Sequence, residues 1–188
     1  MPRFVLASAS PARLRLLRDA GFDPEVVVSG VEEDVDDVLE LARRKAQAVA
    51  ETQRDAIVLG CDSMLQLDGI ALGKPASHEE AVERWQAMRG TSGALTTGHF
   101  MVDTRNRGEA FAVISTVVHF GRPTDDEIKA YVATGEPLHV AGAFTLDGRS
   151  APFVDGIEGC FSNVIGVSLP GVRRLLTTLG VQVTDLWS

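Results

Sequence analysis

Short apolar runs alternate with helical apolar stripes along this chain, and the alternation predicts its elements. Phe4 to Ala7 form an apolar run that is typical of a buried strand. Ser10-Pro11 then favours the start of a helix, because serine caps helices and proline suits their first position. The apolar stripe that follows ends at Gly21, a common helix terminator. The chain is therefore expected to open with a strand, a loop and a helix.

The next segment repeats this order. A second strand is expected at Val26 to Ser29, and one apolar face then marks a helix from Val35 to Val49. Ile57-Val58-Leu59 form a continuous apolar run, which is typical of a strand covered on both faces. Asp68-Gly69 predicts a tight turn soon after this strand.

Hairpins are frequent in the second half. Capping patterns predict helices from Ser77 to Met88 and from Thr124 to Gly135. Between them, strands are expected at Ala94 to Val102 and at Ala110 to Phe120, joined by a polar turn and therefore antiparallel. Asp147-Gly148 predicts a further hairpin.

The end of the chain completes the predicted fold. A last helix is expected to begin at Pro170 and to end at Gly180, followed by a terminal strand from Val181 to Leu186. Helices alternate with strands while hairpins recur, so the pattern favours an α/β fold with a mixed central sheet flanked by helices. The length of 188 residues fits a single domain covering residues 1–188.

Composition and charge narrow the class of protein. A formal net charge of -8 and a pI near 5.0 argue against nucleic acid or an anionic membrane as partners. A small phosphorylated ligand is compatible with this charge, because it needs only a local cluster of basic groups. No apolar run is long enough for a secretory signal or a membrane span, and two distant cysteines show no metal-binding spacing. The cytoplasm is the expected compartment.

The first candidate site is the loop from Ser8 to Arg13, where a strand meets a helix N-terminus. Unpaired N–H groups and the helix dipole attract anions there, and Arg13 adds further donors. The alternative is that Ser10 only caps the helix and that Arg13 is a solvated surface charge. Both interpretations stay open on the local pattern.

Asp62 is the second candidate, because it follows a strand that the pattern marks as buried. A carboxylate at that place can bind a divalent cation or accept a proton from water, although it can also be an ordinary turn residue. Lys74, between glycine and proline, and Lys45, on the second helix, are each either phosphate ligands or exposed lysines. The acidic run from Glu32 to Asp37 is mainly matched to the helix dipole, with one carboxylate available for magnesium.

Other reactive residues carry weaker signals. The four histidines are scattered and match no zinc or triad signature, so a structural role is expected for each. Cys61, beside the candidate aspartate, is interpreted as a small buried side chain. The sequence contains no P-loop motif, which argues against an ordinary kinase or ATPase.

Taken in order along nearly the entire chain, these segments resemble the Maf family of nucleotide pyrophosphatases, which is related in fold to the inosine triphosphate pyrophosphatases. Each motif alone is weak, whereas the ordered set is specific. The set comprises Leu6-Ala7-Ser8-Ala9-Ser10-Pro11 with Arg13, Leu41-Ala42 with Lys45-Ala46, Gly60-Cys61-Asp62-Ser63, Leu72-Gly73-Lys74-Pro75, Thr96-Thr97-Gly98, Gly135-Glu136-Pro137, Ala141-Gly142-Ala143-Phe144 and Ser162-Asn163-Val164-Ile165-Gly166.

The resemblance implies a two-lobed α/β fold with a cleft, dependence on Mg²⁺ or Mn²⁺, and hydrolysis of a nucleoside triphosphate between its α and β phosphates. Asp62 matches the family's catalytic aspartate, and Glu33 matches an acidic residue expected to hold the metal with Asp62. The phosphate-binding positions are matched by Ser8, Arg13, Lys45 and Lys74. The family further suggests cytoplasmic enzymes, often homodimers, that remove unwanted nucleotides and are linked to septum formation.

Two departures from the family pattern concern local packing and the choice of base. Val167-Ser168 interrupts the usual Gly-Leu-Pro-Leu, which is expected to affect local packing more than chemistry. Asp147 stands where members acting on thymidine and uridine triphosphates tend to carry Gln and members acting on methylated guanosine triphosphate tend to carry Glu. An ionised carboxylate only accepts hydrogen bonds, so it pairs with the N–H edge of guanine better than with a pyrimidine O4. We expect broad activity including a modified or guanine-type nucleotide, unless Asp147-Gly148 is a turn outside the pocket.

Two rival functions remain at this stage. A nucleotide-binding regulator of cell division that no longer hydrolyses anything would need the basic residues but not both acidic ones. A pyrophosphatase for deaminated purines such as inosine triphosphate would share the fold, although the Ser8-Ala9-Ser10-Pro11 segment looks like Maf. Because Glu33 and Asp62 are both present, the sequence favours the enzyme.

Overall fold

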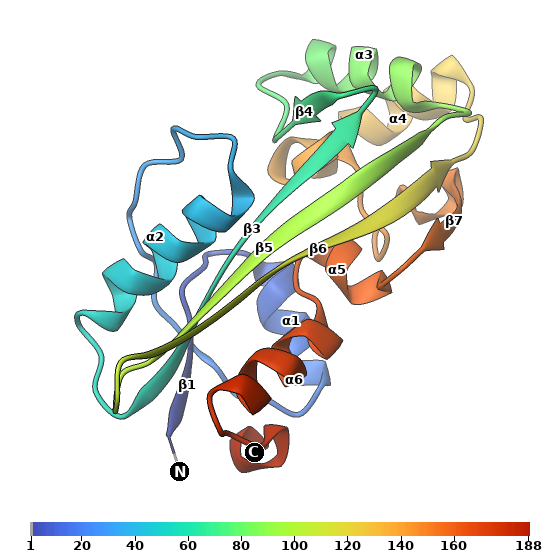
Figure 1. The fold of residues 1–188 in the computed structure, drawn as a ribbon. Coiled ribbons are helices and arrows are strands. Elements are labelled where there is room, and N and C mark those ends of the chain that lie inside the picture. Colours follow the sequence, from blue (N-terminus) through green and yellow to red (C-terminus); the bar gives the residue numbers. More distant parts are fainter. Residues whose placement is uncertain (1) are drawn as a thin grey trace. The chain divides into compact units, whose positions relative to one another are not determined.

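The computed structural model describes residues 2–188 and contains an open, mixed sheet of seven strands with helices packed against it (Figure 1). The strands follow the order β2-β1-β3-β5-β6-β7, and β4 pairs with β3 off this path. The predicted mixed sheet with flanking helices is confirmed. The chain forms two compact units: unit 1 holds the chain up to Asp62 with Thr97–Ile114 and Gly166–Ser188, and unit 2 holds Ser63–Thr96 and Ser115–Ile165.

The elements of the described residues have the following bounds. The strands are β1 (Arg3–Leu6), β2 (Glu25–Val26), β3 (Ala56–Leu67), β4 (Ile70–Leu72), β5 (Ser92–Asp103), β6 (Gly108–Phe120) and β7 (Val154–Glu158). The α-helices are α1 (Pro11–Asp19), α2 (Val38–Ala50), α3 (His78–Met88), α4 (Asp125–Ala133), α5 (Phe161–Ile165) and α6 (Leu169–Thr178). Short 3₁₀ turns are η1 (Glu136–His139), η2 (Ala141–Ala143), η3 (Ala151–Phe153) and η4 (Val183–Leu186). No helix within residues 2–188 combines the length and the apolar character needed to cross a bilayer.

Unit 1 opens with the predicted strand, loop and helix. β1 is buried from Phe4 to Leu6 and pairs in parallel with β2 on one side and β3 on the other. The Ser10 hydroxyl accepts a hydrogen bond from the Arg13 backbone N–H at 3.4 Å, which caps α1 at the predicted residue. Gly21 follows the helix with a φ of +88°, a conformation that favours glycine. β2 is shorter than predicted, covering only Glu25–Val26.

α2 lies close against the sheet because two glycines leave room for its backbone. A Cβ atom at Gly60 on β3 would overlap the carbonyl oxygen of Ala42, and one at Gly98 on β5 would overlap that of Val38. The helix begins at Val38, later than the predicted apolar face, because the Asp37 side chain caps it by accepting two backbone N–H groups. This close packing sets the height of the α2 side chains above β3.

β3 is longer than the predicted strand and continues through Asp62 to Leu67, so the prediction that Asp62 follows the strand is wrong. Its parallel pairing with β1 nevertheless stops at Leu59, opposite Leu6. Asp62 therefore lies just beyond the end of the parallel pair, where the chain after β1 leaves the sheet toward Ser8. Carboxyl ends of parallel strands are the usual place for sites in open α/β sheets.

The C-terminal residues of unit 1 differ from the prediction. The last helix is confirmed, with Ser168 as its cap, one residue ahead of the helix start. The predicted terminal strand from Val181 to Leu186 is wrong, because this segment contains the 3₁₀ turn η4. The Asp185 side chain accepts the Gln182 backbone N–H at 3.1 Å, which closes the turn and removes a donor that a strand would use.

Unit 2 has a core centred on Trp85 of α3. Its ring makes edge-to-face contacts with Phe120, Tyr131 and Phe153, at centroid distances of 5.9, 5.7 and 5.7 Å. The indole N–H donates to the Ala143 carbonyl at 2.7 Å, which satisfies the one polar group of the side chain. Each such ring pair adds about 0.5–1.5 kcal/mol beyond burial, so Trp85 ties α3 and α4 to the sheet.

Turn predictions in unit 2 have mixed outcomes. Asp68-Gly69 joins β3 to β4 as predicted, with both residues at positive φ. The predicted hairpin at Asp147-Gly148 is wrong, because residues 145–150 form a turn that leads into η3. The Glu136 carboxylate accepts hydrogen bonds from the Thr145 hydroxyl at 2.6 Å and the Arg149 backbone N–H at 3.0 Å. The loop thus folds around a carboxylate instead of pairing two strands.

Candidate active site

Unit 1 brings together most of the residues that the sequence singled out. They form two neighbouring groups of contacts, one around the Lys45 ammonium and one around the Arg13 guanidinium. The groups are linked through β3, because Cys61 contacts Arg13 and the next residue, Asp62, contacts Lys45. The members predicted from the sequence are Ser8, Arg13, Glu33, Lys45 and Asp62.

The Lys45 ammonium lies between two carboxylates. Its Nζ atom is 2.7 Å from Oδ1 of Asp62 and 2.6 Å from Oε1 of Glu33. The Lys45 and Asp62 side chains are only 9% and 12% exposed, whereas that of Glu33 is 53% exposed. The contact with Asp62 follows from the close packing of α2 on Gly60, because Lys45 comes directly before Ala46 on the packed face of the helix.

The charges of this group do not cancel. One ammonium shared by two carboxylates leaves one negative charge, and two of the three side chains are shielded from water. Removal of one partner from a buried ion pair typically costs about 3–5 kcal/mol, because the other charge is left unpaired. The arrangement therefore holds a cation firmly and keeps carboxylate oxygens oriented toward it.

Arg13 is fixed by three oxygen acceptors. Its Nε–H donates to the Gly166 carbonyl at 2.7 Å, and Nη1 donates to the Ser8 hydroxyl and to the Cys61 carbonyl, both at 3.1 Å. The Ser8 hydroxyl also accepts the Ser10 backbone N–H at 3.3 Å. These carbonyl and hydroxyl acceptors, which carry no formal charge, orient the guanidinium. An oriented guanidinium beside a helix N-terminus is suited to bind a phosphate group.

Cys61 is fully buried, as the sequence indicated. Burial raises the pKa of its thiol to about 11, despite the nearby Arg13 guanidinium. The thiol therefore stays protonated at neutral pH and does not act as a nucleophile. At this site it serves as a small packing residue whose carbonyl orients Arg13.

His99 was not singled out by the sequence, although it contacts the same segment as Arg13. It is fully buried on β5, and its Nε2 atom accepts the Ser168 backbone N–H at 2.9 Å. Burial, with a further contribution from the Arg13 guanidinium, lowers the pKa of His99 to about 4. A signal was present in the strand pattern, because His99 shares its face with Thr97 and Met101, which point inward.

Lys74 and Asp147 belong to unit 2. Lys74 is exposed on the loop after β4, and this loop is held at the preceding residue, where the Gly73 carbonyl accepts the Gly142 backbone N–H at 3.0 Å. Asp147 is exposed in the turn that Glu136 holds. The predicted roles of Lys74 in phosphate binding and of Asp147 in base selection stay predictions.

Within the described part of the chain, few side chains are arranged as ligands for a metal ion. Within residues 2–188, no group of three or more His, Cys, Asp and Glu residues is arranged to hold a metal ion. Glu33 and Asp62 both contact the Lys45 ammonium, so their carboxylate oxygens lie close to one point. Magnesium is commonly bound by one or two carboxylates together with waters and substrate phosphates, so this pair fits such an ion.

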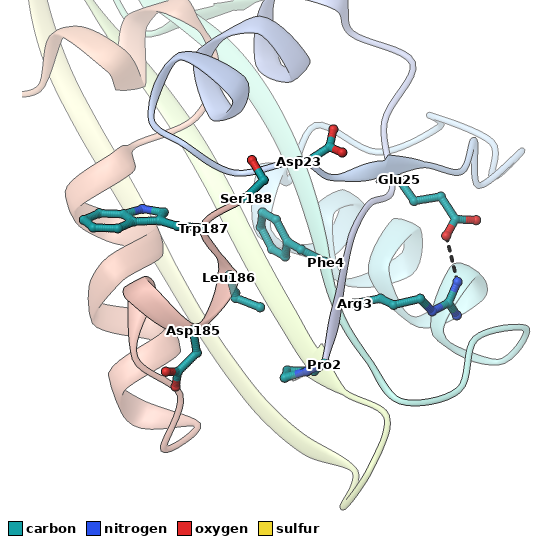
Figure 2. Close-up of a pocket in the computed structure, with 9 residues that line it drawn as sticks. All are labelled: Pro2, Arg3, Phe4, Asp23, Glu25, Asp185, Leu186, Trp187 and Ser188. Atoms are coloured by element: carbon teal, nitrogen blue, oxygen red, sulfur yellow. Dashed lines mark hydrogen bonds and ion pairs between the residues drawn. The ribbon is translucent and has the colours of Figure 1, made fainter.

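A hollow of about 320 Å³ in unit 1 lies apart from these residues (Figure 2). It is lined by residues of β1 and of the C-terminus, including Phe4 and Trp187, and one side carries the ion pair between Arg3 and Glu25 at 2.7 Å. None of the residues predicted for the site lines it. We assign no catalytic role to this hollow.

Comparison with known proteins supports the family resemblance that the sequence motifs suggested. Residues 3–179 match a protein family described as "Maf-like protein". A protein of Streptomyces avermitilis named "Nucleoside triphosphate pyrophosphatase" is 62% identical, with the alignment covering 99% of this chain and 95% of that protein. Proteins with the same name from Streptomyces coelicolor and Salinispora tropica are 60% and 54% identical over 99% of this chain and 95% and 88% of their own lengths.

Proposed function

The chain belongs to the Maf-like protein family, and from this membership we propose how its residues cut a nucleoside triphosphate. It is a nucleoside triphosphate pyrophosphatase, which hydrolyses the bond between the α and β phosphates to give the monophosphate and pyrophosphate. The observation that carries the mechanism is the convergence of Glu33, Lys45 and Asp62 beside the oriented guanidinium of Arg13.

Arg13 and Ser8 are proposed to receive the phosphate chain. The three contacts of Arg13 hold its guanidinium beside the N-terminus of α1, where backbone N–H groups and the helix dipole also favour an anion. Negative charge grows on the leaving pyrophosphate as the bond breaks, so fixed cationic groups stabilise the transition state more than the ground state. Lys45 and Lys74 are proposed to contribute to the same stabilisation.

Asp62 is proposed to orient the attacking water and to accept its proton. The water oxygen forms a bond to the α-phosphorus, the bond to the bridging oxygen breaks, and pyrophosphate leaves. Asp62 is suited to this role because its carboxylate is nearly buried, with one oxygen held by Lys45 at 2.7 Å. A carboxylate held in this way needs little rearrangement to align the water.

Glu33 and Asp62 are proposed to hold a divalent cation, Mg²⁺ or Mn²⁺. Their oxygens are the ligands that such hard cations prefer, and the excess negative charge of the group favours a cation of higher charge than an ammonium. When bound, the ion would polarise the phosphate oxygens and neutralise their charge. The Lys45 ammonium, released from at least one carboxylate, would then be available to the phosphates.

The preferred base is proposed to include a modified or guanine-type nucleotide. Asp147 is the candidate reader, and its carboxylate would accept hydrogen bonds from the N–H edge of guanine. The comparison of wild type with Asp147→Gln on methylated guanosine triphosphate and on thymidine triphosphate tests this role. Asp126→Asn, an exposed residue of α4, is the matched control. Equal substrate preference in all three proteins would show that Asp147 does not read the base.

A panel of nucleotides tests the function and its rivals together. We expect magnesium-dependent release of pyrophosphate that a chelator abolishes. Nucleotide binding without any release would instead indicate a regulator of cell division. Inosine triphosphate as the best substrate would assign the enzyme to deaminated purines.

The cellular setting is also a proposal. We propose that the protein acts in the cytoplasm, as a homodimer, to remove unwanted nucleotides, without nucleic-acid or membrane partners. Deletion of the coding region should then raise the content of modified nucleotides. A septation defect without such a rise would instead support the link to septum formation.

A further inference from the structure

His99 is a buried histidine that the proposed reaction does not use. Its Nε2 atom accepts the Ser168 backbone N–H at 2.9 Å, and a ring nitrogen accepts only when it carries no proton. The neutral ring therefore has its proton on Nδ1, which donates to the Thr97 carbonyl at 3.2 Å. Both ring nitrogens are thus committed to the backbone, so the imidazole has one defined orientation.

The Ser168 N–H needs this acceptor because of how α6 begins. Ser168 is the N-cap of α6, and its hydroxyl accepts the Gly171 N–H at 3.1 Å. In a capping box, a Glu or Gln at the third helical position accepts a hydrogen bond from the backbone N–H of the cap residue. That third residue is Gly171, where a Cβ would overlap the Ile114 side chain. Ser168 is only 1% exposed, so His99 supplies the acceptor that the helix itself cannot provide.

The segment that His99 holds also holds Arg13. Gly166, two residues before Ser168, accepts the Arg13 Nε–H on its carbonyl at 2.7 Å. Its φ of +133° favours glycine, and a Cβ there would lie 3.2 Å from both Cγ and Nε of Arg13. Val167, between them, is fully buried. The turn from Gly166 to Ser168 is therefore hydrogen-bonded to Arg13 at its first residue and to His99 at its last.

We propose that His99 is a positioning residue for Arg13: by accepting the Ser168 N–H, it fixes the turn whose Gly166 carbonyl orients the guanidinium toward the phosphate. This inference rests on the proposed role of Arg13 in phosphate binding. Loss of the acceptor leaves a buried N–H unpaired, so the turn shifts to find another partner and the guanidinium shifts with it. A displacement of about 1 Å at a substrate-positioning group can cost about 100-fold in rate.

Two substitutions of His99 separate its hydrogen bond from its bulk. His99→Gln keeps an acceptor oxygen that can reach the Ser168 N–H, whereas His99→Leu keeps an apolar volume and removes the acceptor. We expect His99→Leu to lower kcat/KM for the nucleotide about tenfold or more, with a fall in kcat, and His99→Gln to stay near wild type. Equal kcat/KM values in both variants would overturn the proposal. His78→Leu, an exposed histidine of α3, is the control for histidine removal itself.

Removal of the donor should cancel the need for the acceptor. Ser168 has a φ of −75°, which suits proline, and Ser168→Pro eliminates the N–H. In that background, we expect His99→Leu to change kcat/KM by less than about twofold, against about tenfold in wild type. An undiminished effect would show that His99 acts through some other contact and would overturn the proposal.

A double-mutant cycle with Arg13→Gln distinguishes positioning from general destabilisation. If His99 acts through Arg13, His99→Leu should have little further effect on kcat/KM once Arg13 is Gln. A similar loss in both backgrounds would indicate general damage and contradict the proposal. If Arg13→Gln alone leaves kcat/KM unchanged, the proposed phosphate role of Arg13 fails, which is a separate result from the failure of His99 to couple.

An independent readout is the pH dependence of stability. Burial lowers the pKa of His99 from 6.5 to about 4, with Arg13 of α1 and Arg174 of α6 as the nearby cations and the backbone of Thr97 and Ala112 opposing them. Between these values the unfolded chain binds a proton that the folded chain excludes, so stability falls as pH drops from about 6.5 to 4. His99→Gln lacks this component. Its urea midpoint should therefore fall less than that of wild type between pH 7 and pH 5, and an equal fall would contradict a neutral His99 acceptor.

Discussion

Replacement of Lys45 by Met should show how much the ammonium stabilises the two carboxylates at the site. The substitution removes an ammonium that lies 2.6 Å from Glu33 and 2.7 Å from Asp62, and it keeps a side chain of similar length on the packed face of α2. The carboxylate of Asp62, whose side chain is 12% exposed, is then left without its cation. The apo protein should lose stability.

The expected loss is at the low end of the range for buried pairs. Breaking a buried ion pair costs about 3–5 kcal/mol, and the half-exposed Glu33 adds little because water screens its charge. A loss of about 3 kcal/mol corresponds to a fall in Tm of about 6–12 °C for a chain of this length. Magnesium should restore part of this loss, because a ligand at about 100 times its Kd stabilises the fold by about 2.7 kcal/mol.

Thermal unfolding with and without magnesium measures both effects. We expect Mg²⁺ to raise the Tm of Lys45→Met more than that of wild type, since the ion no longer competes with the ammonium for the two carboxylates. Arg43→Met, on the same helix, should lose much less stability, because the Arg43 and Glu40 side chains are 42% and 30% exposed and water screens their charges. Equal Mg²⁺ shifts in Lys45→Met and wild type would refute the assignment of these carboxylates to the metal.

Two further predictions concern packing and thiol reactivity. Gly60→Ala should lower stability by about 1–3 kcal/mol and reduce pyrophosphate release, because the new Cβ overlaps the Ala42 carbonyl and pushes α2 away from the sheet. Gly156→Ala should do neither in the same unfolding and activity assays, because a Cβ there would lie 4.0 Å from its nearest neighbour, Cδ2 of His119. Iodoacetamide at pH 8 should modify the partly exposed Cys160 but not Cys61, whose burial raises its pKa to about 11. Intact mass spectrometry counts the adducts, and rapid double labelling of the native protein would contradict the buried thiol.

Local features of the sequence predicted much of the fold. Helix starts depend on a cap residue and its neighbours within one turn, so Ser10, Ser77 and Thr124 marked the starts of α1, α3 and α4 correctly. The hairpin between β5 and β6 was also predicted from its polar turn, and the two strands run in opposite directions (Figure 1). These interactions join residues that are close in sequence, so they can be predicted without knowledge of the fold.

The wrong predictions depend on partners that the local pattern does not contain. The Asp147-Gly148 pair looks like a hairpin turn, but Glu136, more than one helical turn away in sequence, captures the loop backbone. The small residues after Leu59 ended the apolar run and hid the continuation of β3. Both errors arise because tertiary contacts override local turn and strand preferences.

At the candidate site too, the sequence identified single residues but not the tertiary contacts between them. The resemblance to the Maf family named Asp62, Glu33 and Lys45 individually, yet it assigned the lysine to phosphate and the carboxylates to metal. Their mutual ion pairing depends on how closely α2 packs on the sheet. Gly60 permits this close packing, but a single glycine in a sequence does not predict it. His99 was missed because a lone histidine in a strand reveals its acceptor role only when its backbone partner is known.

Pyrophosphate release by Asp62→Asn, measured beside wild type with magnesium and a nucleotide panel, tests the central claim most directly. Asparagine keeps the size of the side chain and one carbonyl oxygen near Lys45, but it removes the charge that accepts a proton and holds the cation. The account predicts a folded variant, by circular dichroism, whose turnover is abolished. A folded Asp62→Asn protein that releases pyrophosphate at the wild-type rate would contradict the assignment of Asp62 to the chemical step.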